Sequence, residues 1–223
     1  RWKMPVLDNP IIIDLDRGDD PTRSIPEGRD VLVLGKTTGI YNGGIHLYSN
    51  GDHSYSLGDC VVLGGKYTSG IALRDFAGTV YIEGVHIDLG GAEEDAFVAH
   101  GNNPSQTPAD VILQNCIAEG INGRPDGVHG DMYQPQGHVS SLRVYNFTGY
   151  SGYQGFMIAE GNLPPQSVDP SVGVIMERVS LRYWNHDDHA ACLYYFDTRS
   201  FPTRPYPITV TDCNVDYKND SVN

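Results

Sequence analysis

Val80-Tyr-Ile-Glu-Gly-Val85 is one of five similar segments that decide the fold of this chain. Each alternates apolar residues and then places one turn-forming or polar residue before a final apolar one. The five starts lie 31, 31, 32 and 34 residues apart, and a weaker copy begins 25 residues before the first. Such a period is typical of a solenoid, in which function has to be sought across neighbouring coils. The other copies are Val111-Ile-Leu-Gln-Asn-Cys116, Leu142-Arg-Val-Tyr-Asn-Phe147, Val174-Ile-Met-Glu-Arg-Val179, Ile208-Thr-Val-Thr-Asp-Cys213 and the weaker Tyr55-Ser-Leu-Gly-Asp-Cys60.

The fifth position of the repeat predicts a sharp corner. Gly84, Asn115, Asn146 and Asp212 tolerate a left-handed backbone well, and only Arg178 departs from the pattern. No stretch resembles a capped helix of a dozen residues, and a leucine-rich repeat, the main alternative, needs more Leu and a helical segment in each unit. The sequence therefore predicts an all-β fold, a single-stranded right-handed parallel β-helix of about six to seven coils.

We expect one domain over residues 1–223. The stretch 1–34, with its apolar run Ile11–Ile13, is predicted to start the coil and cover one open end, and 218–223 to form a polar tail. The formal net charge of −13 argues against nucleic acid as a partner, because phosphate binding relies on Lys and Arg. No apolar run approaches the ~20 residues of a membrane span. An acidic chain with 26 Gly and 14 Pro suits a secreted, extracellular or periplasmic protein.

Three of the four cysteines occupy the last position of the repeat, directly after the corner residue. They are Cys60, Cys116 and Cys213. Equivalent residues in adjacent coils lie ~4.8 Å apart. Cys60 and Cys116 would be two coils apart, which is too far for a disulfide. We therefore expect these thiols to be small core residues rather than metal ligands.

A second strand-like segment follows in each coil, and its alignment places two carboxylates next to each other. Asp131 falls beside Asp95 of the preceding coil, where four other coils carry Gly or Ala. Like charges one strand spacing apart repel, so a shared proton, a bound cation or a basic neighbour is expected there. Turn capping by both side chains is the alternative. The aligned segments begin at Gly44, Gly70, Asp95, Asp131, Gly155 and Ala191.

The run Arg124–His138 is the densest polar cluster in the chain. His129 precedes Asp131 by two residues, so both can project the same way, and a neutral imidazole suits acid or base catalysis. Tyr133 is predicted to face outward, where a phenol can stack on a sugar or donate a proton; packing under a loop is the alternative. The candidate catalytic residues are His129, Asp131, Tyr133 and Arg124, and the candidate substrate-binding residues are Arg74, His100, Gln136, Tyr153 and Glu160.

With these strands and corners, the chain resembles the pectate-lyase-like superfamily of right-handed parallel β-helices over roughly Val31–Tyr217. Members are mostly extracellular enzymes that act on polysaccharides, and several bind glycan in a groove along one sheet. Uronate lyases of this fold commonly use Ca²⁺ and an Arg or Lys base. The resemblance thus implies Ca²⁺ held by Asp95, Asp131 and Asp126, with Arg124 or Arg74 as base. Val128-His129-Gly130 only partly matches the Gly-His-Gly segment of the related hydrolases.

Together these observations predict a secreted lyase that cleaves a uronic-acid-containing polysaccharide. A glycoside hydrolase that uses the Asp95/Asp131 pair is the enzymatic alternative, and one strand spacing suits a retaining mechanism better than an inverting one. A carbohydrate-binding or adhesive β-helix module is the non-enzymatic alternative. The sequence does not indicate an oligomeric state.

Overall fold

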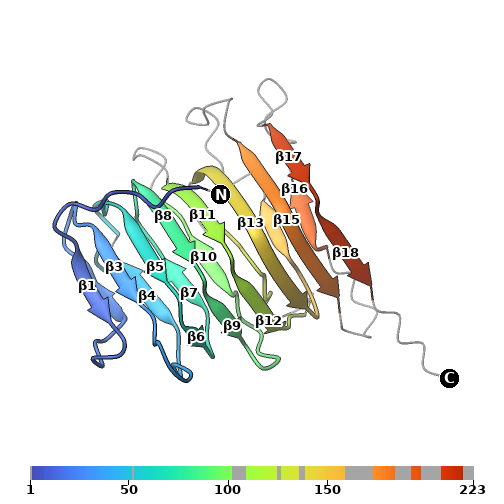
Figure 1. The fold of residues 1–223 in the computed structure, drawn as a ribbon, viewed down its shortest axis with the longest axis horizontal. Coiled ribbons are helices and arrows are strands. Elements are labelled where there is room, and N and C mark those ends of the chain that lie inside the picture. Colours follow the sequence, from blue (N-terminus) through green and yellow to red (C-terminus); the bar gives the residue numbers. More distant parts are fainter. Residues whose placement is uncertain are drawn as a thin grey trace.

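The computed structural model describes residues 2–51, 53–101, 109–124, 127–135, 139–158, 173–183, 192–196 and 207–217. These residues form an all-β structure in which every strand pair is parallel (Figure 1). The strands are β1 (Ile11–Asp14), β2 (Thr22–Ser24), β3 (Val31–Leu34), β4 (Ile45–Tyr48), β5 (Cys60–Leu63), β6 (Lys66–Tyr67), β7 (Ile71–Leu73), β8 (Thr79–Glu83), β9 (His86–Asp88), β10 (Phe97–Ala99), β11 (Ala109–Gln114), β12 (Ile117–Ile121), β13 (Val139–Ser151), β14 (Phe156–Ile158), β15 (Val174–Tyr183), β16 (Tyr194–Phe196), β17 (Ile208–Thr211) and β18 (Asn214–Tyr217).

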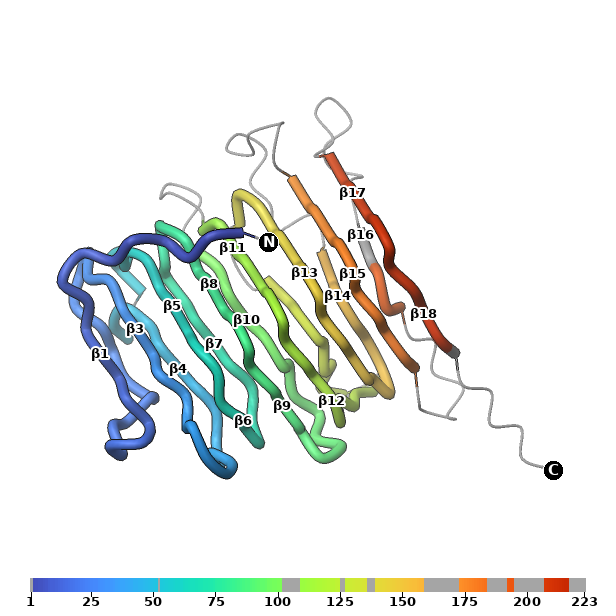
Figure 2. The backbone as a smooth tube through the Cα atoms, in the orientation of Figure 1, coloured from blue at the N-terminus to red at the C-terminus, as the bar shows by residue number. Residues whose placement is uncertain are grey.

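The repeated segment forms the longest run of paired strands. It follows the order β1-β3-β5-β8-β11-β13, and β15 and then β17 extend it. All five strong copies pair in the register that the repeat predicts: Val80 lies beside Val111, Val111 beside Leu142, Leu142 beside Val174 and Val174 beside Ile208. Figure 2 shows these strands side by side in sequence order from blue to red.

Two further runs are formed by the strands that lie, in the sequence, between successive strands of the first run. One contains β6, β9, β12, the second half of β13, the second half of β15, and β18. The other contains β2, β4, β7 and β10, and single bridges through Tyr133 connect β10 to β14, which pairs with β16. From β5 to β10 the strands alternate among the three runs in strict rotation, so residues 20 to 26 apart in the sequence become neighbours.

The weak repeat copy, Tyr55–Cys60, does not occupy the same structural position as the five strong copies. Cys60 opens β5 and pairs with Val31 and Val80, whereas Cys116 directly follows a corner, as does Cys213. The shared-column prediction is therefore wrong for Cys60. Its burial is as expected, since Cys60 and Cys116 are fully buried in a core cluster that extends from Ile13 to Leu193. All four cysteines are free thiols.

The corner prediction is confirmed by the backbone. Gly84, Asn115, Asn146 and Asp212 have φ values of 71°, 55°, 49° and 52°. Arg178 shares this conformation, with φ of 55°, although a long side chain disfavours it. Its guanidinium lies over the Tyr145 ring, 5.7 Å from the centroid, and donates a hydrogen bond to the phenol oxygen. These contacts offset part of the strain.

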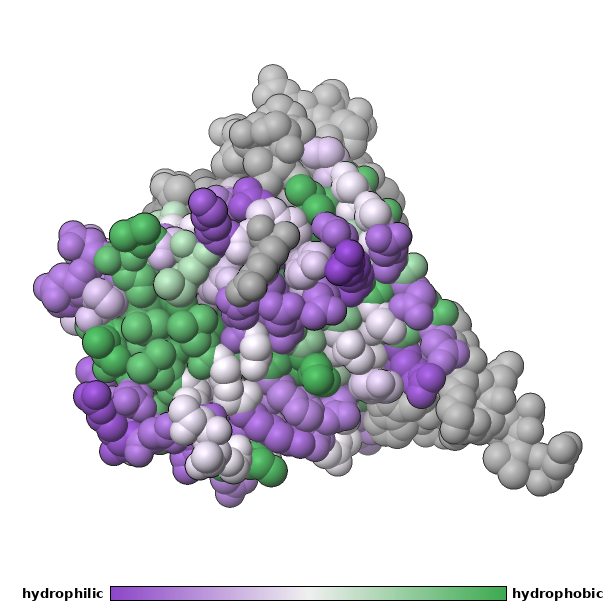
Figure 3. Space-filling view, viewed as in Figure 1, coloured by the Kyte–Doolittle hydropathy of each residue, from purple (hydrophilic) through white to green (hydrophobic). Residues whose placement is uncertain are grey.

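The N-terminal stretch contains the first strand and a segment that packs on the outside of the first run. β1 starts the first run as expected, but the residues before it lie along the outer face of that run. There Trp2 and Leu7 pack on the apolar cluster of Val61, Tyr81 and Ile112. Figure 3 shows apolar surface gathered over the N-terminal strands on this face. Within the described ranges, no helix is long and apolar enough to cross a membrane.

Candidate functional site

A groove crosses the outer face of the sheet made by β2, β4, β7 and β10. Two hollows of about 280 Å³ and 200 Å³ make it up, and they share His46, Ala72 and Arg74 in their linings. We call this continuous surface the sheet groove. The first hollow is also lined by Thr22, Leu47, Tyr48, Asn50, Gly51 and His53, and the second by Gly70, Ile71, Glu94, Asp95 and Val98.

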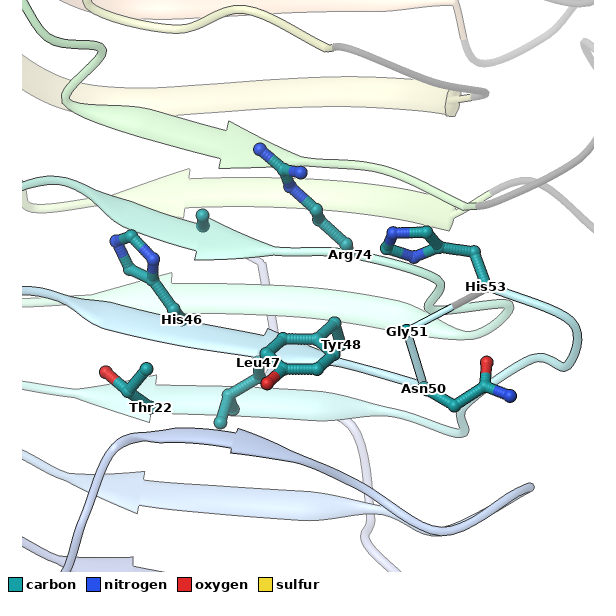
Figure 4. A pocket seen from close by; sticks show the side chains of 9 residues that line it. Thr22, His46, Leu47, Tyr48, Asn50, Gly51, His53 and Arg74 are labelled. Atoms are coloured by element: carbon teal, nitrogen blue, oxygen red, sulfur yellow. The ribbon is translucent and has the colours of Figure 1, made fainter.

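Strand alternation aims the groove's side chains outward. On β4, Ile45 and Leu47 are buried in the core, so His46 and Tyr48 project from the opposite face. The register pairs His46 with Ala72 and Leu47 with Leu73, which places Arg74, just after β7, beside Tyr48. Figure 4 shows His46, Tyr48, Arg74 and His53 on one face.

A histidine–aspartate pair lies at one end of the groove. His53 Nδ1 is 2.7 Å from Oδ2 of Asp75, whose side chain is 1% exposed. A carboxylate oxygen accepts hydrogen bonds, so Nδ1 is the donor in this pair. This is the arrangement in which a buried carboxylate fixes both the orientation and the tautomer of a general base.

The fold holds Asp75 in place. Its Oδ2 also accepts hydrogen bonds from the backbone N and from Oγ of the buried Ser49, both at 2.9 Å. Asp75 has a left-handed backbone, with φ of 72°. Its Oδ1 is buried and has no hydrogen-bond partner within the described ranges of the chain. A strained backbone and an unpaired buried oxygen both destabilise the fold, and such features are concentrated at functional sites.

The loop that carries His53 is also fixed by polar contacts. Asn50 Oδ1 accepts a hydrogen bond from the Ser54 backbone N at 3.0 Å, and Tyr55 donates its hydroxyl to the Ser49 carbonyl at 2.7 Å. His53 itself has a left-handed backbone, with φ of 55°. The imidazole therefore reaches the groove from a constrained turn rather than from a regular strand.

The other end of the groove is acidic. Glu94 Oε1 accepts hydrogen bonds from Ser69 Oγ at 2.6 Å and from the Gly70 backbone N at 3.0 Å. Asp95 Oδ1 accepts one from the backbone N of Asp131 at 3.0 Å. The side chains are thus held at fixed positions on the groove wall, one strand further along than Arg74.

The predicted neighbours Asp95 and Asp131 do lie together, since β10 and the Tyr133 bridge place the two segments side by side. Asp131, however, is fully buried, and neither of its carboxyl oxygens has a hydrogen-bond partner among the described residues. Burial and the nearby Asp95 raise its pKa from 3.8 to about 8. Asp131 therefore does not present its carboxylate to a ligand in the groove, as its prediction as a catalytic and Ca²⁺-binding residue requires.

A one-residue register shift explains this difference. Phe97 pairs with Ile71, and Tyr133 bridges Phe97 and Phe156, one residue later than the alignment places them. Ala96 and Met132 are nevertheless also buried in the core cluster. A shift by one residue turns a side chain to the other face. Tyr133 is consequently buried, not exposed, and donates its hydroxyl to the Ala99 carbonyl at 2.9 Å.

The remaining predicted site residues lie outside the sheet groove or outside the described residues. His129 is exposed, and its ring lies 5.4 Å from that of the buried Tyr153, whose pKa is raised by burial and by Asp131. Arg124 forms an ion pair with Glu93 at 2.7 Å. Asp126, Gln136 and Glu160 lie outside the described residues.

His100 is a neighbour of the groove rather than part of its lining. It is 7% exposed, and its Nδ1 donates to the Gly101 carbonyl at 2.7 Å. Burial lowers its pKa. Of the predicted binding residues, the groove thus contains Arg74 together with the predicted metal ligand Asp95. Across the part of the chain that the structure describes, no three His, Cys, Asp or Glu side chains are placed to hold a metal ion.

Comparison with known proteins gives no relative: no family model, no curated protein and no solved structure matches the chain. The site therefore has to be interpreted from its own geometry. Sequence reasoning missed His46, Tyr48, His53 and Asp75. The signal available for the last two was a histidine in the polar turn Asn50–Ser54 and an aspartate directly after Arg74, at a strand end.

Proposed function

We propose that this protein is a lyase that cleaves a uronic-acid-containing polysaccharide in the sheet groove. The observation that carries the proposal is the His53–Asp75 pair at 2.7 Å in a groove that Arg74 and Tyr48 also line. β-Elimination from a uronate needs a base, a cation for the carboxylate and an acid for the leaving oxygen. Side chains of all three kinds line this groove.

We also propose that the three runs of strands are the walls of a right-handed parallel β-helix of about six to seven coils. The strict rotation of the chain among the runs and the corner residues with left-handed backbones support this architecture. Elongated grooves across successive coils suit an extended polymer, because each coil adds a strand ~4.8 Å further along. We propose that the protein acts outside the cell, which its acidic composition suits.

The proposed reaction assigns one role to each group. Arg74 pairs with the uronate carboxylate and stabilises the negative charge that spreads onto it. His53 Nε2 removes the proton from the carbon next to that carboxylate. The electron pair of the broken C–H bond forms a carbon–carbon double bond, and the glycosidic oxygen leaves the neighbouring carbon. Tyr48 gives the leaving oxygen its proton, so that no water is consumed.

The geometry favours elimination over the hydrolase alternative. A retaining hydrolase needs two carboxyl groups that reach the sugar, about 5–5.5 Å apart. Asp131 is fully buried, so it does not meet a substrate in the groove. The same burial makes the Asp95/Asp131 pair a poor match for Ca²⁺, which takes several accessible oxygens. No step above uses a metal.

The proposal is tested by incubating the protein with a panel of acidic and neutral polysaccharides, with and without added Ca²⁺. Ultraviolet absorbance of the unsaturated product and new reducing ends are followed together. We expect both to rise on a uronate polymer, and both to be lost in His53→Gln. Reducing ends without absorbance would indicate a hydrolase. Affinity with neither signal would indicate a carbohydrate-binding module.

A further inference from the structure

The sheet groove changes charge along its length. His46, His53 and Arg74 line one hollow, and Glu94 and Asp95 line the adjoining one. Both hollows share His46 and Arg74, so the change occurs within a single continuous surface rather than between two separate sites. A polymer bound across the strands would therefore contact His53 at one end of the groove, Arg74 and His46 in the middle, and the two carboxylates at the other end.

The two acidic side chains are fixed parts of this wall. Glu94 is tied to Ser69 and Gly70 through Oε1, and Asp95 to Asp131 through Oδ1. Side chains held this way cannot swing aside when a ligand arrives without breaking those hydrogen bonds. A carboxylate or sulfate on the neighbouring sugar would lie beside these two groups and be repelled.

We infer that the substrate alternates a uronate with a sugar that carries no anionic group. This inference rests on the proposed function, because it places the uronate at Arg74 and the second sugar at Glu94 and Asp95. In a homopolymer of uronate every sugar carries a carboxylate, so the sugar next to the one at Arg74 would bring a negative charge beside Glu94 and Asp95. The net charge of −13 adds to that repulsion over longer distances.

The test compares a homopolymeric polyuronate with a polymer in which glucuronate alternates with an uncharged N-acetylated sugar. Turnover is measured with the wild-type chain, and the affinity for oligosaccharides of both polymers is measured by calorimetry with His53→Gln. We expect the alternating polymer to be preferred about tenfold in both measurements, which corresponds to about 1.4 kcal/mol. Added salt should narrow the preference, because it screens exposed charges.

The double variant Glu94→Gln/Asp95→Asn removes the two charges but keeps the acceptor oxygens. It should bind the homopolymer about as well as the alternating polymer. The matched control Asp8→Asn/Glu27→Gln removes two exposed charges elsewhere and should leave the preference unchanged.

Each outcome decides a separate question. The inference would be overturned if His53→Gln bound both polymers equally or bound neither of them. It would also be overturned if Glu94→Gln/Asp95→Asn kept the wild-type preference for the alternating polymer. If the alternating polymer binds more tightly but no unsaturated product forms, the inferred substrate preference stands and the proposed lyase activity is refuted.

Discussion

Replacing Asp75 by Asn should separate catalysis from folding. Asn tolerates the left-handed backbone of this position, and its amide oxygen can still accept from Ser49. Because the Ser49 and His53 contacts fall on the same oxygen, Oδ2, an amide oxygen in that place also accepts from His53 Nδ1 but carries no charge to stabilise the imidazolium that forms when Nε2 takes up a proton. General base catalysis contributes about 10²–10⁴-fold, so we expect kcat to fall about 10³-fold, or about 4 kcal/mol, with little change in KM.

The same substitution should cost only a modest part of the stability. One charge-assisted hydrogen bond is weakened, which is worth about 2 kcal/mol, or about 6 °C in Tm for a chain of this size. Ser49→Ala is the matched control: it removes the 2.9 Å contact from Oγ to Asp75 but leaves the 2.7 Å contact to His53. It should cost about 1 kcal/mol and lower kcat less than about fivefold. A folded Asp75→Asn variant with more than a tenth of the wild-type kcat would refute the assigned role of His53.

Three further predictions concern stability. Tyr133→Phe removes the buried hydrogen bond to the Ala99 carbonyl, so urea unfolding should show an unfolding free energy lower by about 1 kcal/mol, with turnover unchanged. A large loss of turnover would instead indicate that the hydroxyl takes part in catalysis. Asp131 has its pKa raised to about 8 in the folded state, so it binds a proton there that the unfolded chain has released. The unfolding free energy should therefore fall as pH rises from about 4 to about 8, and Asp131→Asn should flatten that slope; an equal slope in both proteins would contradict the assignment. Arg178→Gly relieves a left-handed residue that costs about 1–2 kcal/mol and loses a contact to Tyr145 worth about 0.5–1 kcal/mol. Calorimetry should therefore show Tm unchanged or up to about 5 °C higher, and a lower Tm would contradict this balance.

The corners and the first run of strands follow directly from the sequence. Gly84, Asn115, Asn146 and Asp212 mark one backbone conformation, and the strands between them repeat at an almost constant spacing. Local chemistry decides both features. The weak copy at Cys60 was misplaced because its coil ends in Gly64 rather than at Asp59, and short apolar runs can be aligned in more than one way.

The candidate site depended on information that local pattern does not contain. Tyr133 and Asp131 were assigned to the wrong environment because single bridges rather than a regular strand hold that segment, and alternation does not fix its register. His53 and Asp75 lie 22 residues apart, on a turn and after a strand. Their contact depends on how far the turn folds back, which only the three-dimensional structure provides.

The most direct test of the central claim is the fate of water in the cleavage. The protein is incubated with a uronate polymer in water labelled with heavy oxygen, and the product ends are analysed by mass spectrometry. β-Elimination in the sheet groove predicts unsaturated ends without label from the wild-type chain and no products from His53→Gln. Saturated ends that carry one labelled oxygen, or unsaturated products at an unchanged rate from His53→Gln, would contradict the account.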